Sequence, residues 1–204
     1  MGVMNMKKTI EEELRNMNAP APDITALLDR AMTEDLVDVA YATVDSPVGQ
    51  LLAASTPKGL VTLAYTEGRI EDVLERLSER VSPRIMEAPE RIDTVRRQLD
   101  QYFEGVRKDF DLDIDWSLSS GFARKILRAT ARIPYGKLLT YRDVARKAGN
   151  EWASRAAGNA LGSNSIPIIV PCHRVIRTGG GLGGYTGGLS KKEFLLDLEG
   201  ALEV

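Results

Sequence analysis

The sequence of 204 residues predicts an α/β protein of the α+β kind. An N-terminal antiparallel β-sheet with helices is expected to precede a mostly helical C-terminal domain. Two observations carry this prediction: three short β-like runs lie close together in the first half, and segments with helical spacing or helix caps dominate the second. A glycine-rich segment near the C-terminus adds a loop or a wing-like hairpin.

The first half predicts a β-meander flanked by helices. The three β-like runs are separated by the turn sequences SPVG and PKG, and they read VAYATVD, GQLLAAST and GLVTLAYT. Two segments after these runs have apolar residues at helical spacing, IEDVLERLSERV and RIDTVRRQLDQYFEG. A third such segment, ITALLDRAMTEDL, precedes the runs. The acidic stretch DFDLDIDWSL alternates apolar and charged residues, which fits either a strand or an extended linker.

The second half predicts a helix followed by a helix-turn-helix. Ser119 or Ser120 can cap SSGFARKILRATARI, which should stop at Pro134. Thr140 can cap the next helix, YRDVARKAG, with Asp143 completing a box-like start. The helix EWASRAAGNALGSN begins only a few residues later. Two short helices joined by a tight glycine-bearing turn are typical of a helix-turn-helix.

The C-terminal segment predicts an extended strand, a loop and a last helix. PIIVPC is interpreted as extended, and RTGGGLGGYTGG holds seven glycines in twelve residues, which favours a loop. A Ser190/Glu193 capping box should start the last helix, and Gly200 should end it.

Composition and charge narrow the classes of protein. A hydrophobic share of 43% and a charged share of 27% are ordinary for a globular protein, and no apolar run predicts a transmembrane helix or a secretory signal. A single cysteine cannot form an internal disulfide, so we expect a cytoplasmic protein.

Charge is divided unevenly along the chain. Residues 117–204 hold 13 Lys and Arg against 6 Asp and Glu, a net charge of +7, whereas residues 1–116 hold 14 against 23, a net of −9. Together these give the net charge of −2 for the whole chain. The basic half indicates a polyanion-binding region, although chance clustering or attraction between the halves would give the same pattern.

The only cysteine and the only histidine are adjacent, as Cys172 and His173. A thiol becomes a nucleophile when a base or a cation favours the thiolate. Neighbouring side chains of an extended chain point to opposite sides, so either the chain bends sharply here or a water bridges the pair. The base also needs an orienting partner. The basic half offers six acidic candidates: Asp143, Glu151, Glu193, Asp197, Glu199 and Glu203.

Metal and nucleotide cofactors are not expected. One cysteine and one histidine fall short of a zinc site, and the glycine-rich loop does not stand between a strand and a helix as a dinucleotide fingerprint would.

The segment IPIIVPCHRVI resembles the active-site signature of the O6-alkylguanine-DNA alkyltransferase family. IPYGKLLTYRDVA resembles the family's approach to its helix-turn-helix, and SRAAGNALGSN resembles its recognition helix and asparagine hinge. GGYTGGLSKKEFLLDLEG resembles its C-terminal loop and helix. The likeness runs from about Phe122 to Gly200 and is looser in the N-terminal meander, which includes VDSPVGQLLAAS.

The resemblance implies DNA repair by direct reversal without a cofactor. The family transfers the alkyl group of O6-alkylguanine, or of O4-alkylthymine, from duplex DNA to one cysteine, irreversibly and once, after flipping the base. Three parts of the chain are then expected: an N-terminal extension with a helix at 1–39, a meander and helix domain at 40–116, and a helix-turn-helix domain for DNA binding and alkyl transfer at 117–204. A monomer is expected, and cooperative binding on DNA is left open. The location implied is the cytoplasm, or the nucleoid or nucleus together with the DNA.

The same resemblance implies roles for the catalytic residues. Cys172 is the nucleophile and alkyl acceptor, and His173 acts as the base through a bridging water. Glu199 matches the carboxylate that orients the histidine. Asn164 matches the hinge asparagine, and Tyr141 matches the tyrosine that pushes the target phosphate and donates to guanine N3.

It also implies DNA and pocket contacts. Arg155 matches the arginine that takes the place of the flipped base, and Arg174 is expected among the DNA-binding residues. Small residues of the same helix let its backbone approach the minor groove, or else only allow tight packing: Ala156, Ala157, Gly158 and Ala160. The carbonyls of Cys172 and Val175 would bind the guanine amine, and the pocket would be lined by Pro167, Tyr185 and Thr186.

The sequence departs from the family in three ways. Ser165 follows the hinge Asn164 where the family has proline, and about 40 residues precede the alignable part. The N-terminal half has no cysteine, so neither zinc nor a transcription-activator function is expected.

Other classes of protein explain less of the sequence. A non-transferring relative would lack Cys172, a thiol hydrolase would not need the helix-turn-helix, and a plain regulator would have no use for the Cys172–His173 pair.

Overall fold

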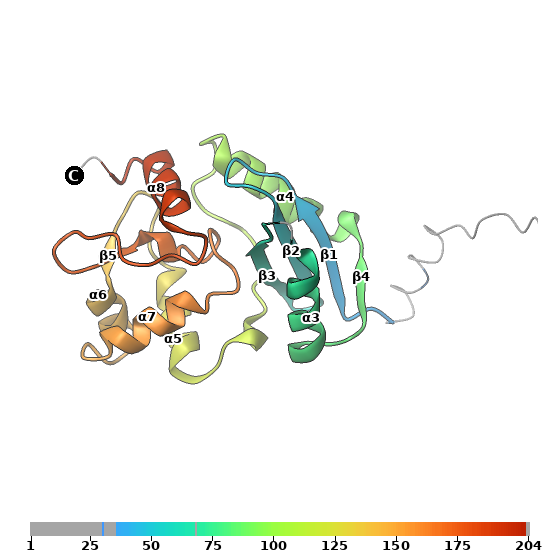
Figure 1. Cartoon of the computed structure of the whole chain (residues 1–204), viewed down its shortest axis with the longest axis horizontal. Helices are drawn as coiled ribbons and strands as arrows, with labels where there is room; N and C mark the ends of the chain where they lie inside the picture. The colour runs from blue at the N-terminus through green and yellow to red at the C-terminus, as the bar shows by residue number, and fades with distance from the viewer. Residues whose placement is uncertain (1–29, 31–35, 68, 203–204) are drawn as a thin grey trace, which may run out of the picture. The chain divides into compact units, whose positions relative to one another are not determined.

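The computed structural model describes residues 30, 36–67 and 69–202 (Figure 1). Contacts divide the chain into Met1–Leu36 and Val37–Val204, and every element below belongs to the second unit. The helix expected for ITALLDRAMTEDL lies almost wholly outside the described residues.

The N-terminal sheet contains the expected meander and one further strand. β1 (Val39–Val44), β2 (Leu51–Thr56) and β3 (Gly59–Tyr65) pair antiparallel, as predicted. β4 (Ile85–Glu87) was not predicted; it pairs parallel with β1 and gives the order β3-β2-β1-β4. The sheet is therefore mixed rather than antiparallel. Three residues are too few for alternation to indicate a strand.

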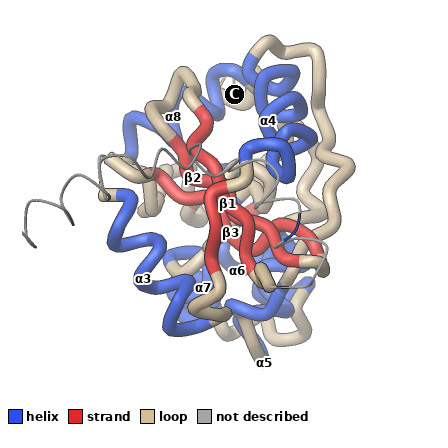
Figure 2. The backbone as a smooth tube through the Cα atoms, turned by 90° about the vertical axis from the view of Figure 1, so that its right-hand side faces the viewer, coloured by secondary structure: helices blue, strands red, loops and turns tan. Residues whose placement is uncertain are grey.

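Two helices lie against opposite faces of this sheet (Figure 2). α3 (Ile70–Arg80) and α4 (Pro89–Phe103) match the two amphipathic segments. Successive side chains of β2 point to opposite faces, so Leu52 packs in the cluster with α3 while Leu51 packs in the cluster with α4. The α4 cluster continues into the C-terminal half, which gives the two halves one core.

The free edge of β3 is covered by two segments of the chain. The Leu60 N–H donates to the Asp113 carbonyl at 2.8 Å, and the Asp115 N–H donates to the Leu60 carbonyl at 2.9 Å. Further along, the Leu63 N–H donates to the Ser165 carbonyl at 2.8 Å. The acidic stretch is therefore an extended linker that makes one bridge to β3 and ends in the short 3₁₀ helix η1 (Trp116–Leu118). Covering an edge strand in this way removes a site for pairing with other chains.

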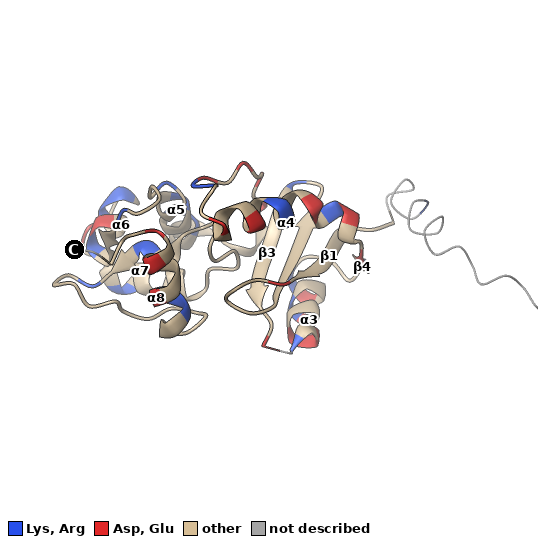
Figure 3. Ribbon diagram, turned by 90° about the horizontal axis from the view of Figure 1, so that it is seen from above, with Lys and Arg blue, Asp and Glu red and all other residues tan. Residues whose placement is uncertain are grey.

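The helices of the second half are α5 (Gly121–Thr130), α6 (Tyr141–Lys147), α7 (Ser154–Gly162) and α8 (Leu189–Leu198). α6 and α7 pack together as the expected helix-turn-helix. Basic residues are frequent on α5 and α6 (Figure 3). No helix among the described residues is long and apolar enough to cross a membrane.

Helix ends follow the sequence at some positions and not at others. Gly200, with a φ of 63°, comes directly after the C-cap residue of α8, as predicted. Thr140 caps α6: its hydroxyl accepts from the Asp143 N–H at 3.1 Å, and the Asp143 carboxylate accepts from the Thr140 N–H at 3.0 Å. Ser120 occupies the cap position of α5 without a side-chain bond, and α5 ends at Thr130 rather than at Pro134. The Ser190/Glu193 box is wrong, because α8 begins at Leu189 after Gly188.

The segment before Cys172 turns instead of running straight. Ile168 adopts a φ of 72°, which a β-branched residue rarely does, and the 3₁₀ helix η2 (Cys172–Arg174) follows directly after Pro171. β6 (Val175–Ile176) then pairs parallel with β5 (Leu139–Thr140), so these strands do not form a wing hairpin. The glycine-rich segment is a loop, closed by a bond of 2.7 Å from the Arg177 N–H to the Gly181 carbonyl.

Candidate active site

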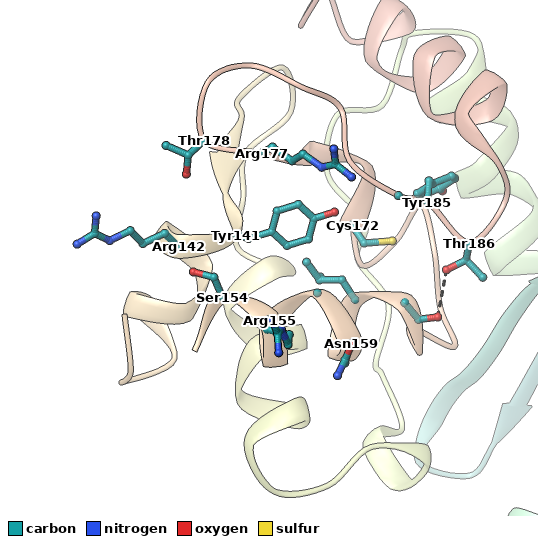
Figure 4. A pocket seen from close by; sticks show the side chains of 14 residues that line it. Tyr141, Arg142, Ser154, Arg155, Asn159, Cys172, Arg177, Thr178, Tyr185 and Thr186 are labelled. Carbon is teal, nitrogen blue, oxygen red and sulfur yellow. Dashed lines mark hydrogen bonds between the residues drawn. The ribbon is translucent and has the colours of Figure 1, made fainter. Parts of the chain in front are cut away.

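The turn at η2 holds the Cys172 thiol at the bottom of a pocket. Cys172 is 5% exposed, and its N–H donates to the Val170 carbonyl at 2.7 Å. This bend is the first of the two alternatives that the adjacent Cys172 and His173 left open. It turns Cys172 toward a cavity of about 670 Å³ between α7 and the glycine-rich loop (Figure 4).

Asn164 connects the end of α7 to the thiol segment. Its side-chain amide donates to the Val170 carbonyl at 2.9 Å and to the Cys172 sulfur at 3.2 Å. Its side-chain oxygen accepts from the Ile166 N–H at 3.1 Å. One buried amide thus fixes both ends of the turn.

Glu199 gathers five hydrogen bonds on one buried carboxylate. His173 Nε2 lies 2.9 Å from Oε1, and Arg174 binds both oxygens at 2.8 and 2.9 Å. The Tyr102 hydroxyl donates at 2.7 Å and the Gly136 N–H at 3.1 Å. Burial would raise the pKa of Glu199, but the bonds from His173 and Arg174 outweigh it and lower that pKa to about 2. Glu199 is therefore an anion.

The protonation of His173 follows from this partner. Burial lowers the pKa of His173 despite the opposing effect of Glu199, so the ring is neutral at pH 7. A carboxylate can only accept, which puts the single ring proton on Nε2 and leaves Nδ1 as a lone pair. Nδ1 is buried and has no hydrogen-bond partner among the described residues. It is placed to accept a proton.

No hydrogen bond joins the side chains of Cys172 and His173 in the described part of the chain. Burial raises the pKa of the Cys172 thiol to about 11, although Asn164 and Lys192 act against it. The thiol therefore keeps its proton at neutral pH and must lose it to a base during any reaction.

Lys192 is a buried cation near the thiol. It is 0% exposed, and its Nζ donates to the Val175 carbonyl at 2.6 Å and to the Leu182 carbonyl. Burial lowers the pKa of Lys192 to about 8. These bonds tie α8 to β6 and to the glycine-rich loop.

The pocket is lined by residues from α6, α7 and the loop. Tyr141, Arg155 and Gly158 come from the helix-turn-helix, and Tyr185 and Thr186 come from the loop. The Tyr141 ring lies close to Gly158, and Figure 4 shows it facing the same hollow as the Cys172 sulfur. The structure thus brings together most of the residues that the sequence pointed to.

Several expected contacts are corrected. Arg174 is 4% exposed and bound to Glu199 and to the Ile133 carbonyl, so it is a buried partner of the carboxylate and not a DNA contact. Ala157 and Ala160 are buried in the core, which favours the packing interpretation for both. Pro167 borders a hollow that adjoins the pocket of Cys172 and shares Gly162 and Thr186 with it.

Four residues that hydrogen-bond to groups of the site carry no signal in the sequence: Tyr102, Gly136, Lys192, and Tyr65, whose hydroxyl oxygen lies 2.8 Å from that of Tyr185. Tyr102 lies on α4, 97 positions from Glu199. A side chain so distant in sequence gives no local signal. Gly136 has a φ of 68°, and a Cβ there would lie 2.9 Å from the Glu199 carbonyl, so glycine is required.

The described residues contain no group of three or more His, Cys, Asp or Glu side chains suited to hold a metal ion. The fold and the site define a class: helix-turn-helix proteins with a buried cysteine at a pocket and a hydrogen-bonded His–Glu pair next to it in the structure.

Comparisons with known proteins agree with this class and narrow it. Residues 39–116 match the ribonuclease-like domain of 6-O-methylguanine DNA methyltransferase, and residues 121–201 match the DNA binding domain. The methylated-DNA–protein-cysteine methyltransferase of Methanosarcina acetivorans is 40% identical over 161 residues, covering 79% of this chain and 98% of that protein. The Mycolicibacterium paratuberculosis protein of the same name is 38% identical, covering 79% and 92%.

Solved structures give the same result. The crystal structure of Mycobacterium tuberculosis O6-methylguanine methyltransferase is 36% identical with a TM-score of 0.68, covering 79% of this chain and 92% of that one. The structure of Mycobacterium tuberculosis OGT in complex with DNA is also 36% identical, with a TM-score of 0.67 and coverage of 78% and 92%. The chain belongs to the 6-O-methylguanine DNA methyltransferase family.

Proposed function

We propose that this protein repairs DNA by direct reversal, moving the alkyl group of O6-alkylguanine, or of O4-alkylthymine, in duplex DNA to Cys172 in one irreversible turnover. The observation that carries the proposal is the order of groups behind the pocket. The protonated thiol of Cys172 lies at the bottom of the pocket. The neutral His173 has an Nδ1 without a hydrogen-bond partner among the described residues, and the ionised Glu199 holds the other ring nitrogen.

The transfer balances without a cofactor. His173 Nδ1 takes the thiol proton through a bridging water, and the thiolate attacks the alkyl carbon. The sulfur–carbon bond forms as the carbon–O6 bond breaks, and the electron pair goes to guanine. The Tyr141 hydroxyl donates to guanine N3, and the proton from the thiol finally resides on the restored guanine. The alkylated sulfur cannot leave again, so each molecule acts once.

The base must leave the helix before it can reach Cys172. Unstacking costs a few kcal/mol, and a side chain inserted into the duplex can offset part of it. Arg155 is exposed at the start of α7 and borders the pocket, which supports its role as the inserted residue. Ala156 and Gly158 of the same helix remain the small residues that let its backbone approach the minor groove, since neither is buried in the core.

Recognition of the flipped guanine would use the pocket rim. The carbonyls of Cys172 and Val175 are proposed to accept hydrogen bonds from the guanine amine. The Val175 carbonyl already accepts from Lys192, so it would have to accept both hydrogen bonds at once. Tyr185 and Thr186 form the side that the loop contributes. Hinge Asn164 fixes the distance between α7 and the thiol.

This function assigns DNA binding and transfer to residues 117–204, with the sheet domain at 40–116 and an extension at 1–39. The partner is double-stranded DNA carrying the alkylated base, bound by a monomer, in the cytoplasm or wherever the DNA lies.

The test is the mass of the intact protein after incubation with a duplex that contains one O6-methylguanine. We expect one added methyl group per molecule, located on the Cys172 peptide. The Cys172→Ser variant should bind the duplex and gain no mass. Unchanged mass of the folded wild-type protein would refute the transfer, and loss of DNA binding by Cys172→Ser would make the thiol structural.

A further inference from the structure

Tyr65 connects the N-terminal sheet to the pocket. It is the last residue of β3, far from the helix-turn-helix in sequence. Its hydroxyl oxygen lies 2.8 Å from the hydroxyl oxygen of Tyr185, and the two rings meet edge-on with centroids 6.1 Å apart. This contact links the N-terminal sheet to a pocket residue.

Tyr185 borders the reacting groups directly. Its ring lines the pocket of Cys172 and stands edge-on to His173, with ring centroids 6.3 Å apart and planes at 88°. A rotation of this ring would change the space next to the sulfur. Among the described residues, Tyr65 is the hydrogen-bond partner of the Tyr185 hydroxyl.

Tyr65 is itself held in place on two sides. The backbone of Gly187 lies so close that a Cβ there would be 2.5 Å from the Tyr65 ring. The Lys191 ammonium lies 5.2 Å from the centre of the same ring and 3.1 Å from the Glu67 carboxylate. Tyr65 therefore has little freedom, which makes it a firm support for Tyr185.

We infer that Tyr65 is a positioning residue that sets the width of the alkyl pocket by fixing the Tyr185 ring, an inference that rests on the proposed alkyl transfer. A methyl group needs little space beside the sulfur. A bulky O6 substituent needs the Tyr185 ring to move, which breaks the bond to Tyr65. The N-terminal sheet thereby selects small alkyl groups, although it does not touch the base.

The test compares Tyr65→Phe with the wild type on two duplexes, one with O6-methylguanine and one with O6-benzylguanine. Loss of one neutral hydrogen bond should slow methyl transfer about 3- to 10-fold. Benzyl transfer should slow less or become faster, so the ratio of benzyl to methyl rates rises at least about 3-fold. Single-turnover rates at saturating DNA give both values.

Tyr41→Phe is the matched control. Tyr41 lies on β1 of the same sheet and packs in the cluster with α3, away from the pocket. Tyr41→Phe also removes one tyrosine hydroxyl, and the ratio of benzyl to methyl transfer rates should stay at the wild-type value.

A double variant separates positioning from general stability. If Tyr65 acts through the Tyr185 hydroxyl, adding Tyr65→Phe to Tyr185→Phe should leave both rates as they are in Tyr185→Phe alone. Gly187→Ala, which displaces the Tyr65 ring, should raise the ratio as Tyr65→Phe does. Equal slowing of both transfers by Tyr65→Phe, or an additional effect in the double variant, would overturn the inference while leaving the proposed function intact. A wild-type protein that transfers neither group would overturn both.

Discussion

The two halves of the molecule bury different kinds of residue. Among the described residues before 117, the buried polar side chains other than tyrosine are Thr62, Thr66, Gln98 and Asp115, of which one is ionisable. From 117 onward, they are Thr130, Asn164, His173, Arg174, Lys192 and Glu199, of which four are ionisable. The sheet half is held by apolar packing, and the helical half encloses a charged network.

This difference separates the support of the site from its chemistry. Buried charge contributes little net stability, but removing one partner leaves the other uncompensated and is strongly destabilising. The helical half must therefore be complete to be stable, because its ionised groups depend on one another. The sheet half contributes to the site through two hydroxyls, from Tyr102 to Glu199 and from Tyr65 to Tyr185.

The largest expected effect comes from Glu199→Gln. The change leaves Arg174 buried without a counter-charge, so the free energy of unfolding should fall by about 3–5 kcal/mol. His173 also loses its orienting anion, so transfer to Cys172 should nearly cease in the fraction that remains folded. Urea denaturation and intact-mass analysis measure the two effects. A stable variant with unimpaired transfer would show that the network is dispensable.

A core truncation in the sheet half should affect stability alone. Leu77 is 1% exposed on α3 and packs against β2, so Leu77→Ala should lower the free energy of unfolding by about 2–5 kcal/mol. Because no group of the site touches this cluster, the rate of methyl transfer by the folded protein should match the wild type. A slower rate at a temperature where the variant is fully folded would break the division between the halves.

Acid should loosen the helical half first. The pKa of Glu199 is about 2, below the ordinary value of 4.5, so its contribution is complete above pH 4.5 and is lost as the pH falls toward 2. The difference corresponds to a loss on the order of 3 kcal/mol. The lowered pKa of His173 acts in the same direction, starting below pH 6.5. Sheet residues contribute less, since Asp115 is their one buried carboxylate.

Amide hydrogen exchange, followed separately for each segment, measures the loss of stability of the two halves in acid. At about pH 3, protection of η2 and α8 should fall before protection of β1 to β3. Uniform loss over both halves would contradict the comparison. In Glu199→Gln, the dependence on pH between 4.5 and 3 should flatten, because the group that titrates has been removed.

The sequence predicted regular elements well and the site's environment only in part. Alternation in β1 to β3 and the spacing in α3 and α4 arise from burial on one face, which a local pattern records. β4 and the bend before Cys172 leave no such local pattern, because strand pairing and the positive φ of Ile168 are imposed by neighbours distant in sequence. The adjacency of the only cysteine and the only histidine pointed to Cys172 and His173, and family resemblance pointed to Glu199. Tyr65 and Tyr102 reach the site across the two halves, which no local motif can indicate.

The smallest expected effect compares two helix starts in the helical half, and it tests how far a local signal can be trusted. Thr140 caps α6 with a bond from the Asp143 N–H, so Thr140→Ala should lower the free energy of unfolding by about 1 kcal/mol. Ser120 occupies the same position at α5 without such a bond, so Ser120→Ala should change stability by only a few tenths of that. Thermal denaturation of the two variants measures the difference. Equal losses would mean that both serine and threonine act as caps in solution, and that the sequence pattern was the better guide at α5. A loss at Thr140 alone would show that a hydroxyl side chain at the N-cap position stabilises the helix only where its oxygen accepts a hydrogen bond from a backbone N–H.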